Sequence, residues 1–256
     1  MDHLQRTAQE FTRQAKQFAS SAAITAADLT ARFVDAVGAG PDTTILDVAC
    51  GPGIVTAAMA AKARAVVAFD LTPEMLLQAR DRCAKAGLTN VTFEQGNATA
   101  LPFPDNSFDG VVTRLSVHHF DAPRLVLAEM FRVLRPGQKF VLADVLSSED
   151  AGESELHNAI EVLRDPSHVR MLPATELASM ITDAGFTIDA QSTWDQPRKF
   201  EEWAGIVDDP QRVAPLRTIV QRLARAGEHA GFGLSLIDGA VVFFHRWHLL
   251  TGRKPQ

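Results

Sequence analysis

The stretch Ile45-Leu46-Asp47-Val48-Ala49-Cys50-Gly51-Pro52-Gly53 decides the fold of this chain, because a short apolar run leads directly into a glycine turn. Glycine carries no Cβ, so such a turn lets the backbone pass close to a ligand. Residues 54–62 favour a helix, whose first N–H groups lack partners within the helix and attract polar or anionic groups. Asp70 ends the next apolar run and can accept hydrogen bonds from both hydroxyls of a ribose. The stretch therefore predicts a site for a nucleoside cofactor.

The length and composition of the chain favour a single globular enzyme or binding protein. Its 256 residues suffice for one large α/β domain with an appended cap, and its net charge of −6 includes no long basic run. We therefore expect no dedicated nucleic-acid surface. Two cysteines, no apolar signal core and no membrane-length apolar run predict a cytoplasmic protein without a membrane partner. Its oligomeric state stays open, a homodimer included.

Strand and helix patterns alternate regularly along the first two thirds of the chain. Five apolar runs favour strands, at 44–49, 65–70, 91–95, 108–113 and 139–144. Further strands are expected at 186–190 and 240–249, and helices at 10–22, 72–85, 153–164, 174–184 and 199–227. The alternation predicts an α/β fold with a doubly wound, mainly parallel sheet, whose ligands lie beyond the carboxyl ends of the strands.

Two segments depart from this alternation. Residues 147–180 and 193–235 carry helical patterns between the late strands. Long connections inside a compact domain are commonly functional, for example as lids over a binding site. We expect these segments to be helical insertions that cap the substrate pocket, within a single domain of residues 1–256.

Two cofactors compete for the glycine turn. A nicotinamide dinucleotide site usually has a third glycine, in the pattern Gly-x-Gly-x-x-Gly, which allows the helix to pack closely on the strand. Thr56 stands at that position here. The difference weakens the dinucleotide interpretation without excluding it, so an NAD-dependent oxidoreductase stays as an alternative.

Three motifs in order resemble a known enzyme family. Asp47-Val48-Ala49-Cys50-Gly51-Pro52-Gly53 is similar to the first motif of the class I S-adenosylmethionine-dependent methyltransferases. Leu101-Pro102-Phe103-Pro104-Asp105-Asn106-Ser107-Phe108-Asp109 and Leu134-Arg135-Pro136-Gly137 resemble later motifs of the small-molecule branch that includes the quinone-biosynthesis methyltransferases. The resemblance runs from about residue 45 to residue 146. It implies a Rossmann-like fold with a seven-stranded sheet, S-adenosylmethionine as cofactor and S-adenosylhomocysteine as product.

The resemblance also implies roles for individual residues. Asp47 would lie near the amino group of the cofactor, Asp70 would bind the ribose hydroxyls, and Asn97 replaces the acidic residue that usually accepts from the adenine. Segment 1–40 would form a helical lid that carries Phe11 and Phe18, although helical spacing alone favours core packing for both. The residues that the resemblance places around the cofactor are Phe11, Phe18, Asp47, Ala49, Gly51, Gly53, Asp70, Leu71, Met75, Asn97, Ala98, Arg114 and Leu115.

Histidines provide the candidate general bases. His118 and His119 follow the fourth strand, at the sheet edge where the acceptor should lie. On the helix at 153–164, His157, Glu161 and Arg164 share one face. That face is either a solvated polar surface or, together with His168, a set of groups presented to an anionic or phenolic acceptor.

The remaining candidates have weaker support. Trp203 can line an apolar acceptor pocket or pack in the core, and His245 suits a packed core position in the final strand. No His/Asp/Glu cluster has convincing metal-ligand spacing, so we expect no metal.

The sequence therefore predicts methyl transfer from S-adenosylmethionine to an O, C or N atom of a small, ring-containing metabolite. A methyltransferase-like protein that uses the bound cofactor for a cyclisation or a decarboxylation has the same fold and the same cofactor site, and stays as an alternative.

Overall fold

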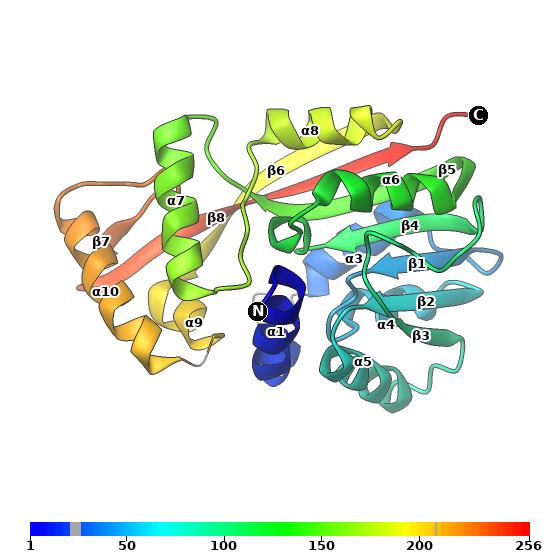
Figure 1. Ribbon diagram of the computed structural model, residues 1–256, viewed down its shortest axis with the longest axis horizontal. Helices are drawn as coiled ribbons and strands as arrows, with labels where there is room; N and C mark the ends of the chain where they lie inside the picture. Colours follow the sequence, from blue (N-terminus) through cyan, green and yellow to red (C-terminus); the bar gives the residue numbers. More distant parts are fainter. Residues whose placement is uncertain (21–26, 208) are drawn as a thin grey trace.

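The computed structural model describes residues 1–20, 27–207 and 209–256, and within these ranges an eight-stranded sheet runs through the molecule (Figure 1). Its strand order is β3-β2-β1-β4-β5-β8-β6, and β7 pairs with β8 outside that path. β1 to β5 are parallel, whereas β8 is antiparallel to β5 and β6. The doubly wound, mainly parallel α/β fold is confirmed, with short β7 added to the seven expected strands. The strands are β1 Thr44–Val48, β2 Ala65–Asp70, β3 Val91–Gln95, β4 Phe108–Arg114, β5 Leu134–Leu146, β6 Thr187–Lys199, β7 Ser235–Ile237 and β8 Ala240–Arg253.

Helices cover both faces of the sheet. Successive β1 residues point to opposite faces, so Ile45 joins the core beneath α3 and α4, while Leu46 joins the core beneath α6 and α8. This double coverage explains the continuous apolar run in the sequence. The helices are α1 His3–Ser20, α3 Ala27–Val37, α4 Ile54–Ala60, α5 Pro73–Lys85, the 3-10 turn η1 Val117–His119, α6 Pro123–Val133, α7 Ala151–Arg164, α8 Ala174–Asp183, α9 Phe200–Gly205 and α10 Pro210–Arg225.

A second lobe, the cap, extends from one end of the sheet (Figure 1). Its core is formed by α7, α9, α10 and the first residues of β8. β5 ends where Leu146 pairs with Arg246, but β8 continues to pair with β6 as far as Val242 and Lys199. The cap is therefore built on the extension of these two strands. α8 contacts α6 and β6 and covers the sheet, although it lies in the segment that we expected to form part of the cap.

The helical stretch expected near 199–227 contains two helices in the structure, α9 and α10. Pro210 has no N–H and cannot continue a helix, but it fits the first position of a new one. The Asp209 side chain caps α10 by accepting from the backbone N–H groups of Gln211 and Arg212.

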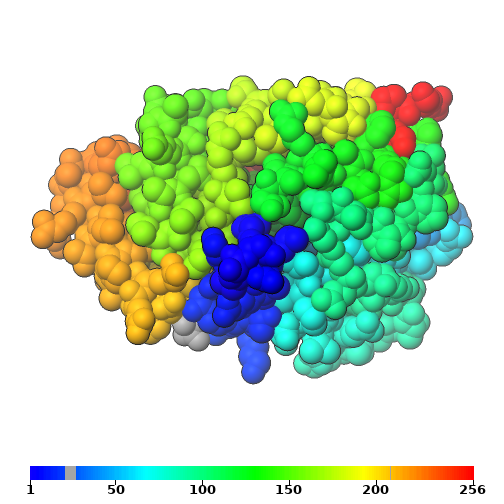
Figure 2. All heavy atoms as spheres, in the orientation of Figure 1, coloured from blue at the N-terminus to red at the C-terminus, as the bar shows by residue number. Residues whose placement is uncertain are grey.

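Helix α1 lies between the cap and α5 (Figure 2). It begins earlier than the expected residue 10, and Ala22, which we placed on it, lies outside the described residues. Thr12 Oγ1 donates to Glu74 Oε2 at 2.9 Å, and Arg13 Nη1 donates to Asp209 Oδ2 at 3.1 Å. The helix thus bonds to α5 on one side and to the cap on the other. No helix in the described part of the chain is long and apolar enough to cross a membrane.

Candidate active site

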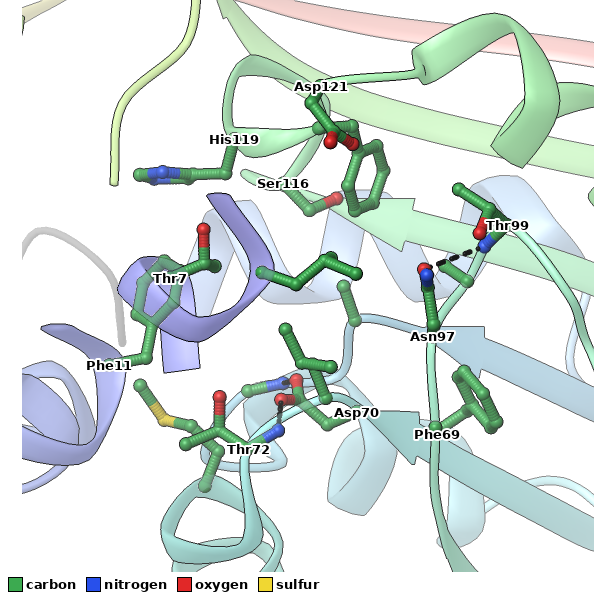
Figure 3. A pocket seen from close by; sticks show the side chains of 18 of the residues that line it. Thr7, Phe11, Phe69, Asp70, Thr72, Asn97, Thr99, Ser116, His119 and Asp121 are labelled. Atoms are coloured by element: carbon green, nitrogen blue, oxygen red, sulfur yellow. Dashed lines mark hydrogen bonds between the residues drawn. The ribbon is translucent and has the colours of Figure 1, made fainter. Parts of the chain in front are cut away.

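The glycine turn after β1 borders a cavity of about 740 Å³ at the carboxyl ends of the strands (Figure 3). Ala49 and Gly51 have φ values of +55° and +53°, a conformation that is unfavourable for a residue with a Cβ. A Cβ built on Gly51 meets no atom within 4 Å, so the glycine borders open space. The turn therefore leaves room for a ligand at this edge of the sheet.

Asp70 is held in the wall of this cavity by the backbone. Its Oδ2 accepts from the N–H of Gly51 and its Oδ1 from the N–H of Thr72, both at 2.8 Å (Figure 3). Burial raises the pKa of the Asp70 carboxyl, and these two hydrogen bonds oppose that shift. A carboxylate has about four lone-pair sites, so Asp70 can accept further bonds from a diol.

Asp47 and Arg114 line a second cavity, of about 490 Å³, on the other side of the turn. Burial raises the pKa of Asp47 to about 7, and the hydroxyl of Thr56, which donates to Asp47 Oδ2 at 2.5 Å, opposes that shift. Burial lowers the pKa of Arg114 to about 10, and the charge of Asp47 opposes it. Thr56, the residue in place of the third glycine, thus has a positive role in this turn: its hydroxyl orients the carboxylate.

Gly53 has a packing role beside the glycine turn. It lines neither cavity in the described structure and caps α4 with φ +72°. A Cβ built there would lie 2.7 Å from the Cβ of Ala79 on α5. The glycine is needed for close packing of α4 against α5, and its place beside the cofactor stays a prediction.

The other expected cofactor residues lie in these two cavities. Asn97 Oδ1 already accepts from the N–H of Thr99 at 3.0 Å, which leaves one lone pair for a ligand (Figure 3). Phe11 borders the first cavity and Phe18 the second. The first cavity also contains Leu71 and Ala98, and both cavities contain Ala49, Met75 and Leu115.

A third cavity, of about 560 Å³, lies next to the first two and shares Phe18, Leu115 and His119 with them. We call it the acceptor cavity, because it lies where the sequence predicts the acceptor. It extends toward the cap and is lined by apolar and charged side chains. Its other walls are His118, Val145, Glu161, Arg164, Met171, Arg198, Trp203, Ile206, His245 and Trp247.

Comparison with known proteins identifies the family. The methyltransferase domain matches residues 46–142. The chain is 34% identical over 170 residues to YafE of Escherichia coli, covering 66% of this chain and 82% of that protein. The chain belongs to the class I S-adenosylmethionine-dependent methyltransferases.

Two further relatives support this assignment. The uncharacterized methyltransferase YcgJ of Bacillus subtilis is 34% identical over 159 residues, which cover 62% of this chain and 63% of that protein. Its crystal structure superposes with a TM-score of 0.82, covering 89% of this chain and 98% of the other, at 28% identity. Demethylmenaquinone methyltransferase of Renibacterium salmoninarum is 42% identical over 111 residues, covering 43% of this chain and 45% of that enzyme. The match to the named quinone enzyme is thus limited to less than half of its length.

The paired histidines of the methyltransferase have opposite electrostatic surroundings. Burial alone would lower the pKa of His118, but the charge and hydrogen bond of Asp144 raise it above its usual value. Burial lowers the pKa of His119 to about 4, and the neighbouring His118 lowers it further. His119 Nδ1 lies 3.1 Å from the carbonyl oxygen of Ser167, so this nitrogen carries a proton and donates. His119 is therefore a neutral wall residue, whereas His118 is the more easily protonated of the two.

The other two candidate bases, His157 and His168, line none of these three cavities in the described structure. His168 Nε2 lies 2.8 Å from Asn158 Oδ1, and burial lowers the pKa of His168 to about 3. His157 stacks on Phe232 with ring centroids 4.1 Å apart. The structure places both histidines behind the cavity wall, so we assign them no contact with the acceptor.

The polar face of α7 is buried, so its interpretation as a solvated surface is wrong. His157 and Glu161 are 2% and 3% exposed, whereas Leu163 on the adjacent stripe is 47% exposed. Glu161 accepts from His245 Nε2 at 3.1 Å and from Arg164, whose guanidinium also lies 4.7 Å from the ring centroid of Trp203. Arg164 and Trp203, the predicted substrate-binding residues, both line the acceptor cavity.

Sequence spacing missed a buried group of metal-binding residue types. Ligand atoms of His157, Glu161 and His245 all lie within 4.8 Å of one another. His245 comes from β8 rather than α7, so no local spacing reveals the group. It also lies beside two guanidinium groups, Arg164 and Arg198, whose charge opposes cation binding.

Proposed function

We propose that this chain transfers a methyl group from S-adenosylmethionine to an O, C or N atom of a small, ring-containing metabolite. The observation that carries the proposal is the position of His118, a paired histidine in the wall of a cavity that adjoins the cofactor cavities. When bound, the cofactor supplies an electrophilic methyl group on a sulfonium sulfur. The chain has to hold the acceptor against that methyl group and to accept a proton from it.

The residues around the glycine turn fit the cofactor. Gly51 borders open space, Asp70 retains lone pairs for the ribose hydroxyls, and Asp47 offers a carboxylate to an ammonium group. Leu71 and Met75 offer apolar surface to the adenine, and the side-chain carbonyl of Asn97 retains one lone pair for its amino group.

His118 is the residue that we assign as general base. Asp144 accepts the Nδ1 proton, so the lone pair of the neutral ring is on Nε2. Nε2 has no hydrogen-bond partner among the described residues and can take a proton from a hydroxyl or an activated carbon. If the acceptor is an amine, the same histidine would take its proton and keep the amine unprotonated.

The surroundings of the acceptor cavity support a small ring-containing acceptor. Trp203, Trp247 and Met171 provide flat or adaptable apolar walls. The partial similarity to a demethylmenaquinone methyltransferase agrees with a ring substrate. We propose that segment 1–40 acts as the lid and that segments 147–180 and 193–235 supply the cap, within one domain of residues 1–256.

Two measurements test the proposal. Calorimetric titration should show tight binding of S-adenosylhomocysteine and weak binding of NAD; preference for NAD would contradict the family's cofactor. Incubation with S-adenosylmethionine labelled in the methyl group and a metabolite extract should yield a labelled small molecule. If a metabolite of the extract is converted but the product carries no label, the cofactor serves a cyclisation or a decarboxylation instead.

A further inference from the structure

Unpartnered donors gather around the acceptor cavity. Nε and Nη2 of Arg198 and Nε1 of both Trp203 and Trp247 are buried without a hydrogen-bond partner among the described residues. All three residues line the acceptor cavity. Buried polar groups in folded proteins almost always have partners, so unpaired atoms call for an explanation. Because every one of these four atoms is a donor, a ligand that satisfies them has to supply acceptor atoms.

Arg198 is the principal charge among these donors. The residue is 6% exposed, and its Nη1 lies 3.5 Å from Nδ1 of His245. Glu202 Oε1 is 3.8 Å from Arg198 Nη2, beyond hydrogen-bond distance, and that side chain is 46% exposed. The ion pair with Glu202 therefore leaves Nε and Nη2 of Arg198 without a hydrogen bond, and a buried guanidinium in that state is costly unless something else bonds to it.

The neighbouring carboxylate is already committed to other partners. Oε2 of Glu161 accepts from Nε of Arg164 at 3.1 Å, and Oε1 accepts from Nε2 of His245 at 3.1 Å. Nδ1 of the neutral His245 is then the acceptor that faces Arg198. Asp144, the carboxylate behind the opposite wall, is paired with His118. Among the residues that line the cavity, the guanidinium groups of Arg164 and Arg198 thus face one carboxylate, Glu161, and the only other carboxylate that the described residues place near Arg198 is the half-exposed Glu202.

We propose that the acceptor cavity binds a methyl acceptor with an anionic oxygen group, a carboxylate or a phosphate, on a flat apolar body. The anionic group pairs with the guanidinium of Arg198, and the apolar body lies along Trp203 and Trp247. A guanidinium offers two parallel N–H groups that match such oxygens. This inference rests on the proposed function, since it names the substrate class of that same cavity.

A divalent cation on His157, Glu161 and His245 is the competing occupant. Both ring nitrogens of His157 are buried and unpartnered, as a ligand histidine without its metal would be. However, Glu161 already bonds to the guanidinium of Arg164, and Arg198 lies beside His245. The guanidinium groups beside Glu161 and His245 therefore oppose the binding of a cation there.

The test uses the full chain and three naphthalene probes of matched shape. 1-Naphthoate, 1-naphthyl phosphate and the neutral 1-naphthamide are titrated by calorimetry, with and without S-adenosylhomocysteine. The unaltered protein should bind at least one anionic probe about tenfold more tightly than the amide. Arg198→Gln should abolish that preference. Arg246→Gln, which removes an exposed arginine one residue from His245, should leave it unchanged.

Binding of S-adenosylhomocysteine separates this inference from the proposed function. Equal affinity of the cofactor product for the Arg198→Gln and unaltered proteins shows that the variant is folded. If the unaltered protein does not bind S-adenosylhomocysteine, the proposed function is contradicted. Equal binding of acid and amide, no binding of either anionic probe, or an unchanged preference in Arg198→Gln overturns the anion site. Micromolar binding of Zn²⁺ alone that His245→Ala abolishes would assign the cavity to a cation and overturn it as well.

Discussion

Nδ1 of His118 lies 2.5 Å from Oδ1 of Asp144, and Oδ2 of the same carboxylate accepts from the backbone N–H of Val117 at 2.7 Å. One carboxylate therefore fixes both the imidazole ring and the turn that carries it. His118 lies in η1, the turn that follows β4, and Asp144 lies near the end of β5; the two strands are parallel neighbours with Arg114 opposite Ala143. The strand register thus creates the pair.

The first prediction concerns turnover. His118→Gln should lower kcat by about 10²- to 10⁴-fold if His118 is the general base, because proton transfer then falls to water. Asp144→Asn should cost less, since the imidazole stays but loses its orienting charge. Neither change should alter the affinity for S-adenosylhomocysteine. His229→Gln, at an exposed histidine in the cap, is the control, and a His118→Gln enzyme with full activity would remove His118 from the reaction.

The second prediction concerns pH. A protonated His118 cannot accept a proton, so kcat/KM should rise with pH through an inflection above the usual histidine pKa of about 6.5. The inflection lies high because Asp144 outweighs the opposing effect of burial on the His118 pKa. Asp144→Asn removes the raising charge and should move the inflection to lower pH. A pH–rate profile of both enzymes measures this, and an inflection that stays in place would assign it to another group.

The sheet could be predicted because each strand of a parallel sheet buried on both faces leaves a local apolar signature. The orientation of α7 could not be predicted in the same way. Spacing shows that His157, Glu161 and Arg164 share a face, but not whether that face is buried. The polar face turns inward because His245 of β8 supplies a bond to Glu161, and this partner lies 84 residues away.

The same distinction between local and long-range contacts applies to the candidate site. Gly51 and Asp70 could be located from sequence, since their hydrogen bond depends only on adjacent strands and a local turn. Arg198 could not, because its position beside His245 follows from the antiparallel pairing of β6 with β8. Asp144 was missed for a related reason: a polar residue late in a buried strand signals a role, but not its partner.

Thr56→Val provides a third prediction. Loss of the hydroxyl that donates to Asp47 removes a contribution that lowers the Asp47 pKa, which burial has already raised to about 7. More of the carboxyl is then protonated at neutral pH. A hydrogen bond to a charged group contributes about 1.5–3 kcal/mol, so affinity for S-adenosylhomocysteine at pH 7 should fall about tenfold or more. The loss should shrink at pH 9. Thr92→Val, at an exposed position of β3, should have no effect at either pH, and an equal loss at both pH values would point to packing instead.

Gly53→Ala provides a fourth prediction. The left-handed conformation costs a residue with a Cβ about 1–2 kcal/mol, and contact with Ala79 adds about 1–3 kcal/mol of overpacking. The free energy of unfolding, measured in urea, should fall by the sum of the conformational cost and the overpacking cost. Gly87→Ala is the matched control, because Gly87 also has a positive φ but its Cβ would meet nothing within 4 Å. Equal losses in the two variants would show that the contact with Ala79 contributes nothing.

Arg82→Ala tests the attachment of α1 to the glycine turn. Arg82 Nε donates to the carbonyl of Pro52 and Nη2 to the carbonyl of Ala19, each at 2.9 Å, so one guanidinium joins α5, the turn and the end of α1. Without it, a lid formed by α1 should open more often, and S-adenosylhomocysteine should dissociate about tenfold faster in stopped-flow measurements. Arg80→Ala on the same helix is the control, since Arg80 donates to the carbonyl of Phe93 and lies over its ring. If both variants release the product at the same rate, α1 does not gate the cofactor site through this residue.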